Sequence, residues 1–325
     1  MVLPPSLSER IALPVVCAPM LLVSSPELVI ESRKAGVVGA FPRQSARNRE
    51  DFEGWLRRIQ DEIGEWAATT GGVPGPLAVN LHTNVPDLAT ELDLCAAAGV
   101  DILITALGDP VELTAMAHDR GLLVWHDVTA MRFADKAAAA GVDGMTCIGA
   151  GGGGHSGTVS HLALIPKVRR MFDGTIALAG AVATGAAVRA AEILGADLAY
   201  VGTRFTATVE SAADPRQKEW IVAGGAADLE YTAKVNGVPA NWMRASLAAR
   251  GIDLAALEAP VTRGHEHLGG PRPWRDLWSA GQGIELIDDI PTVAELVARL
   301  ETEYLAACAL PDRVAVVRGR HEVVG

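Results

Sequence analysis

Apolar runs and amphipathic stretches alternate regularly over the first two thirds of the chain. A helical stretch ends in Gly and a short apolar run then begins, as at Gly36, Gly99, Gly121, Gly141 and Gly195. Gly after a helix supplies a left-handed C-terminal cap, and an unbroken apolar run is typical of a strand buried on both faces. The pattern therefore predicts parallel strands joined by crossover helices.

The spacing of the runs predicts eight strands. They cover residues 15–21, 37–41, 76–81, 102–107, 122–128, 144–150, 175–180 and 198–205. Helices are expected near 26–35, 50–68, 86–98, 110–120, 130–140, 160–172, 184–194 and 215–224. This count favours an α/β fold of the (β/α)8 TIM-barrel class. A doubly wound open sheet is the alternative, but its G-x-G-x-x-G turn is missing after the first strand, which ends in Ala18-Pro19-Met20.

The alternation stops near residue 225. Gly, Pro and Trp are frequent beyond that point, and a final helix is predicted to start at Pro291, after Asp288 and Asp289. We therefore expect a barrel over residues 1–224 and a smaller helical and loop region over 225–325. This region would cover the active-site face and could act as a lid, and the last dozen residues would form a solvated tail.

Charge and composition narrow the class of partner. The formal net charge is −11, with 28 basic and 39 acidic residues and no basic cluster, which argues against nucleic acid and anionic membranes. No apolar run reaches the length of a membrane helix, and the start MVLPPSLSER lacks the features of a secretion signal. Four scattered cysteines suggest reduced thiols. We expect a cytoplasmic enzyme with a small-molecule substrate, and the sequence gives no indication of its oligomeric state.

The most informative segment is GAGGGGHSG, after the sixth predicted strand. Gly151 to Gly154 remove every side chain from a loop at the expected barrel mouth, which would let a planar or anionic ligand lie against bare N–H groups. His155 follows directly and can exchange a proton near neutral pH. The alternative is a flexible surface loop with an incidental His.

Small residues also end the seventh and eighth strands. Gly180 is followed by Thr184-Gly185 at a helix start, and Gly202-Thr203 close the eighth strand. Barrels commonly bind phosphate at these two strand ends. Tight helix–strand packing would select Gly as well.

Weaker candidates lie on the first, third and fifth strands. Ala18-Pro19-Met20 could form a wall against a flat ring, and Asn80 could bind the edge of a heteroaromatic ring, although an ordinary strand end would explain either. Of His126 and Asp127, strand alternation places one in the pocket. The segment 265–267 (His-Glu-His) has no evident third ligand, so no metal site is expected.

Taken together, APM at 18–20, AVNLH at 78–82, GGGGHSG at 151–157, the segment 177–211 and AGQG at 280–283 resemble the nitronate monooxygenase family. The resemblance implies a TIM barrel that binds FMN at the strand ends. By position, Ala18, Pro19 and Met20 would line the flavin ring and Asn80 would contact it. Gly153 and Gly154 would lie near the flavin, Gly180, Ala181, Gly202 and Thr203 would hold its phosphate, and His155 falls on the catalytic histidine.

The sequence departs from the family pattern in its loops. Ile148, Gly151 and Gly152 replace Gln, Glu and Ala, and Gly180-Ala181-Val182 replaces Gly-Gly-Ile. The resemblance implies FMN-dependent oxidation of nitroalkanes or nitronates with O2. His155 would be the general base, or would stabilise negative charge if the substrate arrives as the nitronate. The alternatives are an NAD(P)H-dependent flavin reductase of enoyl thioesters or quinones, and a barrel that binds flavin without catalysis.

Overall fold

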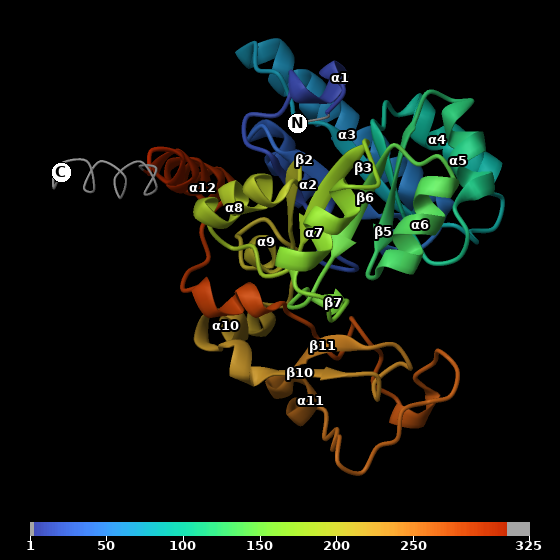
Figure 1. The fold of residues 1–325 in the computed structure, drawn as a ribbon, viewed down its shortest axis with the longest axis vertical. Helices are drawn as coiled ribbons and strands as arrows, with labels where there is room; N and C mark the ends of the chain where they lie inside the picture. The colour runs from blue at the N-terminus through green and yellow to red at the C-terminus, as the bar shows by residue number, and fades with distance from the viewer. Residues whose placement is uncertain (1–2, 311–325) are drawn as a thin grey trace, which may run out of the picture.

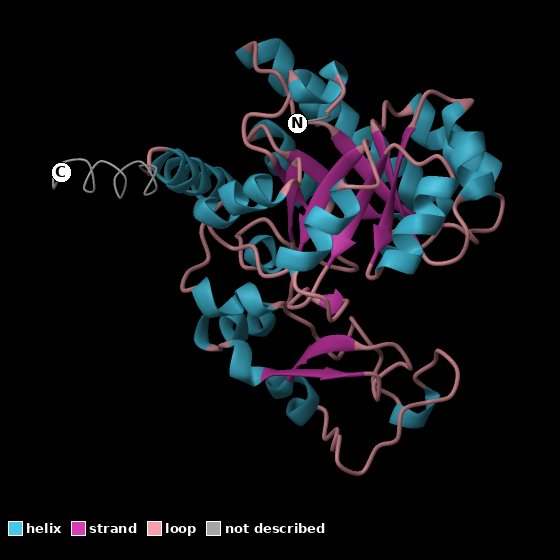
Figure 2. Ribbon diagram, viewed as in Figure 1, coloured by secondary structure: helices cyan, strands magenta, loops and turns pink. Residues whose placement is uncertain are grey.

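The predicted alternation closes into a barrel with a smaller lobe beneath one end (Figures 1 and 2). The computed structural model describes residues 3–310. Within them, parallel strands pair in the order β1-β2-β3-β4-β5-β6-β8-β9, and the register Val16↔Tyr200 joins β1 to β9. The barrel strands are β1 Val15–Cys17, β2 Val38–Pro42, β3 Leu77–His82, β4 Ile102–Ala106, β5 Leu123–Val128, β6 Gly144–Ile148, β8 Thr175–Ala179 and β9 Leu198–Val201. The predicted TIM barrel is confirmed.

Helices connect these strands on the outside of the barrel. They are α2 Pro26–Lys34, α3 Arg49–Thr70, α4 Leu88–Ala97, α5 Val111–His118, α6 Met131–Ala139, α7 His161–Arg169 and α8 Gly185–Leu194, with a 3-10 turn η1 Arg43–Ser45 before α3. The glycines that separate helix from strand have φ between +62° and +106°, as predicted, at Gly36, Gly99, Gly121, Gly141 and Gly195. A left-handed residue at these points ends the helix and turns the chain into the next strand.

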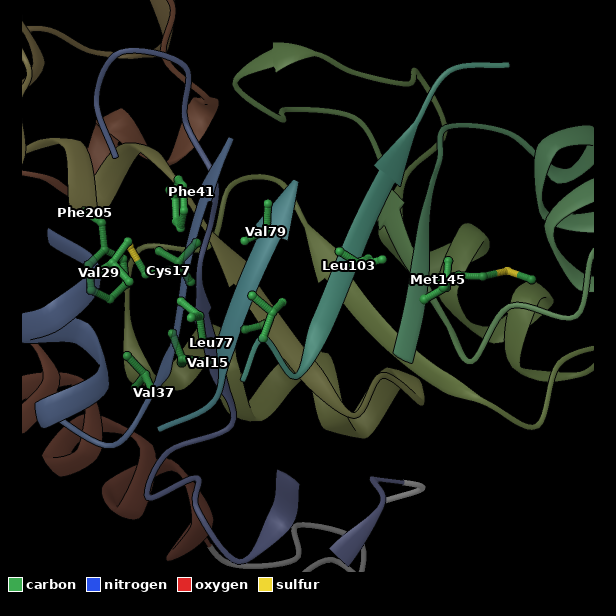
Figure 3. Packing of buried hydrophobic residues seen from close by; sticks show 14 of the residues in the cluster. Val15, Cys17, Val29, Val37, Phe41, Leu77, Val79, Leu103, Met145 and Phe205 are labelled. Atoms are coloured by element: carbon green, nitrogen blue, oxygen red, sulfur yellow. The ribbon is translucent and has the colours of Figure 1, made fainter. Parts of the chain in front are cut away.

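Each strand buries both faces. One set of side chains packs inside the barrel and includes Val16, Ile104 and Trp125, while the alternate set packs under the helices. Figure 3 shows part of the second set: Cys17 lies close to Val29 and Phe205, and Val79 and Leu103 follow on the neighbouring strands. The short helix α1 Pro5–Ser8 places Leu7 in the inner cluster. The lobe lies at the end of the barrel that is opposite to α1 (Figure 1).

The first and last barrel strands are shorter than predicted. β1 ends at Cys17 because the chain then turns, and the Ser24 hydroxyl holds that turn by accepting from the Met20 N–H at 2.9 Å. The predicted strand 198–205 ends at Val201, and the chain continues as the short helix α9 Thr203–Thr206. The sixth strand likewise ends at Ile148.

The helix that completes the barrel is α12 Val293–Cys308, which packs on α8 and α2. The sequence pattern predicts the helix near 215–224, after the eighth strand, in this role. That helix, α10 Pro215–Ala223, instead packs its Ile221 with Met243 and Trp278 of the lobe. α12 begins two residues later than predicted, because Thr292 and Glu295 form its capping box.

The lobe contains a small sheet in addition to helices and loops. β10 Leu229–Thr232 pairs with β11 Ala240–Met243, which pairs in turn with β7 Gly154–His155 of the glycine loop. The remaining elements are α11 Arg244–Ala249 and the 3-10 turns η2 Ala226–Asp228, η3 Glu266–Leu268 and η4 Gln282–Leu286. The predicted division of the chain between residues 224 and 225 stays a prediction. α12 belongs to the predicted second region, 225–325, but packs on the barrel helices. The predicted tail, the last dozen residues, lies outside the described residues.

Two further properties concern the described chain as a whole. None of its helices is long and apolar enough to cross a bilayer. Cys17, Cys95 and Cys147 are buried and Cys308 is exposed, and all are free thiols. Burial raises the pKa of Cys147 to about 12, so this thiol stays protonated and acts as a core residue.

Candidate functional site

A cavity of about 750 Å³ opens at the carboxyl ends of the barrel strands, between the barrel and the lobe. All of the residues predicted for catalysis or cofactor binding line it: Ala18, Pro19, Met20, Asn80, Gly153, Gly154, His155, Gly180, Ala181, Gly202 and Thr203. The lobe contributes Arg263, Trp274 and Gly281 among others. The structure thus brings the predicted set together, while the role of each residue stays a prediction.

The glycine loop is held tightly by the segment 279–282. The Gly154 N–H donates to the Ser279 hydroxyl at 2.6 Å, and the Gln282 N–H donates to the Gly151 carbonyl at 2.8 Å. A Cβ at Gly153 would lie 3.0 Å from the Gly281 nitrogen. The loop therefore has no room for side chains here, and it presents main chain to the cavity.

Three segments meet around the predicted phosphate site. A Cβ at Gly180 would lie 3.0 Å from the Gly152 nitrogen, and one at Gly153 would lie 3.4 Å from the Thr203 hydroxyl. Among the described residues, the N–H groups of Gly152, Gly153, Ala181 and Thr203 donate to no protein acceptor. Free N–H groups in such a concave arrangement are suited to binding an anion.

Ala181 adopts a left-handed conformation, with φ of +59°. This backbone costs a residue with a Cβ about 1–2 kcal/mol. The resembled family has Gly at this position. The Cβ of Ala181 lies 3.4 Å from the point that a Cβ on Gly151 would occupy. The strain at the cavity wall follows from this departure.

The first and third strands shape the opposite wall. The Met20 sulfur accepts from the Thr206 hydroxyl at 3.1 Å, which fixes the side chain against α9. The Asn80 amide donates to the Ile104 carbonyl at 3.0 Å. Its Oδ1 has no partner within residues 3–310 and can accept from a ligand.

His155 lines the cavity with a neutral ring. Its Nε2 lies 3.0 Å from Nδ2 of Asn236, and its ring meets Trp274 edge-on, with centroids 5.3 Å apart. Burial, reinforced by the positive charge of Arg263, lowers the pKa of His155 to about 4. The imidazole is thus uncharged at neutral pH.

Of the fifth-strand pair, Asp127 is the one that points into the barrel, since it shares a face with Trp125 of the inner cluster. Burial raises the pKa of Asp127 to about 7, and its Oδ1 has no partner in the described chain. The His126 side chain leaves the other face of the strand, and its Nδ1 contacts the Thr105 hydroxyl at 2.7 Å. His126 nevertheless lines the cavity as Asp127 does, so the expectation that one of the two lies in the pocket is wrong.

The lobe adds residues to the site that the sequence does not predict. Asn236, Arg263 and Trp274 come from loops without a motif, and the frequent Trp beyond residue 225 was the one available signal. His161 was also missed as a support: its ring donates to the Ala179 carbonyl at 2.8 Å, beneath Gly149 and Gly180.

The His-Glu-His segment forms no metal centre in the part of the chain described. His267 Nε2 contacts the Lys234 carbonyl at 2.7 Å, and Glu266 accepts from the His265 N–H. No group of three or more candidate ligands is found within residues 3–310.

Comparisons with known proteins agree with this geometry. The family profile described as nitronate monooxygenase matches residues 7–303. A 5-hydroxy-7a-methyl-1-oxo-octahydro-1H-indene-4-carboxyl-CoA dehydrogenase of Rhodococcus jostii is 29% identical over 87% of this chain and 90% of its own. The solved structure of a FabK mutant from Thermotoga maritima superimposes with a TM-score of 0.76 at 25% identity, covering 98% of this chain and 100% of that one. A nitroalkane oxidase from Streptomyces ansochromogenes gives 0.75 at 23% identity, covering 96% and 99%. The chain belongs to the nitronate monooxygenase family and is an oxidoreductase of that type.

Proposed function

We propose that this enzyme binds FMN in the cavity and oxidises nitroalkanes or their nitronate anions with O2. The observation that carries the proposal is that four free backbone N–H groups and His155 line one cavity. The N–H groups of Gly152, Gly153, Ala181 and Thr203 fit a phosphate group. Ala18 to Met20 and the free Oδ1 of Asn80 fit the face and edge of a planar ring.

The protein residues would place the substrate beside the cofactor. A bound flavin supplies an electron acceptor that O2 can reoxidise. His155 is the side chain that handles the acidic position of the substrate: a neutral ring can take the α-proton of a nitroalkane or hydrogen-bond to a nitronate. Trp274 packs against His155 and would shield one side of this position from water.

A spectrum and one variant test this function. The purified protein is expected to show the visible absorption of a flavin, or to gain it with added FMN. His155→Ala should keep this absorption and lose about 10²- to 10⁴-fold in kcat/KM for the better of a nitroalkane and its nitronate, measured by O2 consumption. His118→Ala, on the exposed face of α5, serves as the control.

Each part can fail separately. A preparation that stays colourless in excess FMN would exclude the proposed cofactor. Wild-type turnover by His155→Ala would exclude a catalytic role for the ring.

A second candidate is oxidation of an acyl-CoA thioester. Arg132 and Arg263 line the cavity, and neither forms an ion pair with a carboxylate in the described chain. Unpaired arginines are suited to the phosphates of CoA, and the Rhodococcus relative is named as a carboxyl-CoA dehydrogenase. Such a reaction would need a base for the α-proton, and a bound flavin would supply the acceptor for the hydride of the β-carbon.

Binding of CoA tests this candidate. We expect Arg132→Ala and Arg263→Ala each to raise the Kd for CoA about 10-fold, in line with loss of a charge-assisted hydrogen bond. Arg57→Ala, an exposed arginine on α3, is the control. Equal affinity in all variants, measured by calorimetry, would remove the support for a CoA substrate.

A further inference from the structure

Asn236 makes a directed contact with the ring of His155. It lies between β10 and β11, is buried, and places Nδ2 3.0 Å from His155 Nε2. Its other amide atom, Oδ1, accepts from the Val238 N–H at 3.2 Å. Because Oδ1 is used in this way, Nδ2 is the atom that faces the ring. An amide nitrogen only donates, so His155 Nε2 must accept and carry no proton.

The surroundings hold the ring in this orientation. The backbone of His155 is fixed in β7 by pairing with Ala240, and its ring meets Trp274 edge-on with planes at 86°. Trp274 stacks in turn on the buried Trp242, with centroids 4.5 Å apart. A ring packed in this way does not readily turn over to exchange its two nitrogens.

The charged groups near His155 also favour the neutral ring. Arg263 and His82 are the titratable groups that act on it, and both lower its pKa. No carboxylate in the described chain pairs with the ring, and burial together with the two cationic groups outweighs the hydrogen bond with Asn236. Nδ1 has no protein partner within residues 3–310, and His155 lines the cavity whereas Asn236 does not.

We propose that Asn236 is a positioning residue that fixes His155 as the tautomer protonated on Nδ1. The ring then offers the substrate a hydrogen-bond donor, and its lone pair on Nε2 is occupied. A donor stabilises a substrate that is already an anion, whereas abstraction of a proton needs a free lone pair. Resting on the proposed function, the consequence is that nitronates, not neutral nitroalkanes, are the substrates.

The tautomer can be read directly by NMR. In flavin-loaded protein with ¹⁵N-labelled histidine, the His155 signals are identified by their loss in His155→Gln. At pH 7.5 we expect the proton on Nδ1 in the wild type. Asn236→Asp should move it to Nε2, because a carboxylate accepts where the amide donated, and should raise the pKa of the ring. Asn241→Asp is the matched control, since this buried asparagine bonds to the Gly152 carbonyl and not to His155.

Kinetics give an independent reading. Asn236→Asp frees Nδ1 as a base, so the ratio of kcat/KM for a nitroalkane to that for its nitronate should rise at least 10-fold over wild type. If that variant does not fold, Asn236→Ala should shift the ratio in the same direction, because it removes the donor.

The outcomes separate the inference from the function. A wild-type ring protonated on Nε2, or a tautomer unchanged in Asn236→Asp, overturns the role of Asn236 whatever the turnover. The predicted tautomer with no turnover of either substrate would leave that role standing and overturn the proposed function.

Discussion

At the scale of single residues, the most unusual group is a carboxylic acid inside the barrel. Asp127 lines the cavity with an unpartnered Oδ1, and burial raises its pKa from an ordinary 3.8 to about 7. The folded state holds the Asp127 proton more tightly than the unfolded state does. The free energy of unfolding is therefore highest below the unfolded-state pKa and falls until the pH reaches the folded-state pKa. The penalty therefore grows between about pH 4 and pH 7.

Asp127→Asn is expected to remove this penalty. The variant should gain up to about 4 kcal/mol of unfolding free energy relative to wild type on going from pH 4 to pH 8, since three pKa units correspond to about 1.4 kcal/mol each. Urea unfolding at the two pH values measures the difference. Asp135→Asn, on the exposed side of α6, should show no such change. A difference that does not depend on pH would contradict the raised pKa.

At the scale of elements, a buried arginine ties α9 to the segment before α12. Arg204 is 2% exposed and binds the Asp289 carboxylate at 3.0 Å and the Asp289 carbonyl at 2.9 Å. Arg299 binds the same carboxylate from the surface, with 42% of its side chain exposed. Arg204 and Arg299 thus bind the same Asp289 carboxylate, one from a buried and one from an exposed position.

Arg204→Ala should lower the free energy of unfolding by about 3 kcal/mol, because it removes a buried side chain together with its charge-assisted hydrogen bonds to Asp289. Arg299→Ala should lower it by less than about 1 kcal/mol, as exposed pairs contribute little. Denaturant unfolding of both variants decides. Equal losses would mean that burial does not govern this link.

At the scale of the whole molecule, the barrel is completed by a helix from the far end of the chain. The buried face of α12, which includes Val293, Leu296 and Leu300, belongs to the cluster under the barrel helices. The chain leaves the barrel after α9, builds the lobe, and returns. The lobe is thus an insertion whose two ends are both anchored in the barrel.

Leu300→Ala should therefore destabilise the whole barrel, by about 3 kcal/mol for a fully buried leucine. Leu305→Ala, on the same helix but 58% exposed, should change the stability by less than about 0.5 kcal/mol. Thermal and urea unfolding of the two variants compare them. A small effect of Leu300→Ala would show that α12 is not needed to close the barrel.

The barrel residues of the candidate site could be predicted from the sequence because a barrel brings the ends of its strands together. The ends of the first, third, sixth, seventh and eighth strands supply Met20, Asn80, Gly153, Gly180 and Thr203, and each lines the cavity. Their identification needed only local patterns and the rule that parallel strands carry their sites at the carboxyl edge.

The lobe residues were not accessible in this way. Asn236 and Trp274 come from loops whose position depends on β7 pairing with β11, a contact between residues more than 80 positions apart. No local pattern encodes such a pairing.

The sequence by itself determined the helix–strand period, the glycine caps, the barrel and the bare loop before His155, since these depend on neighbours along the chain. The tertiary structure decided which helix completes the barrel, which of His126 and Asp127 shares a strand face with Trp125, and which nitrogen of His155 contacts Asn236. Each of these depends on packing between distant segments, where burial and hydrogen-bond geometry select one arrangement from several that the local sequence allows.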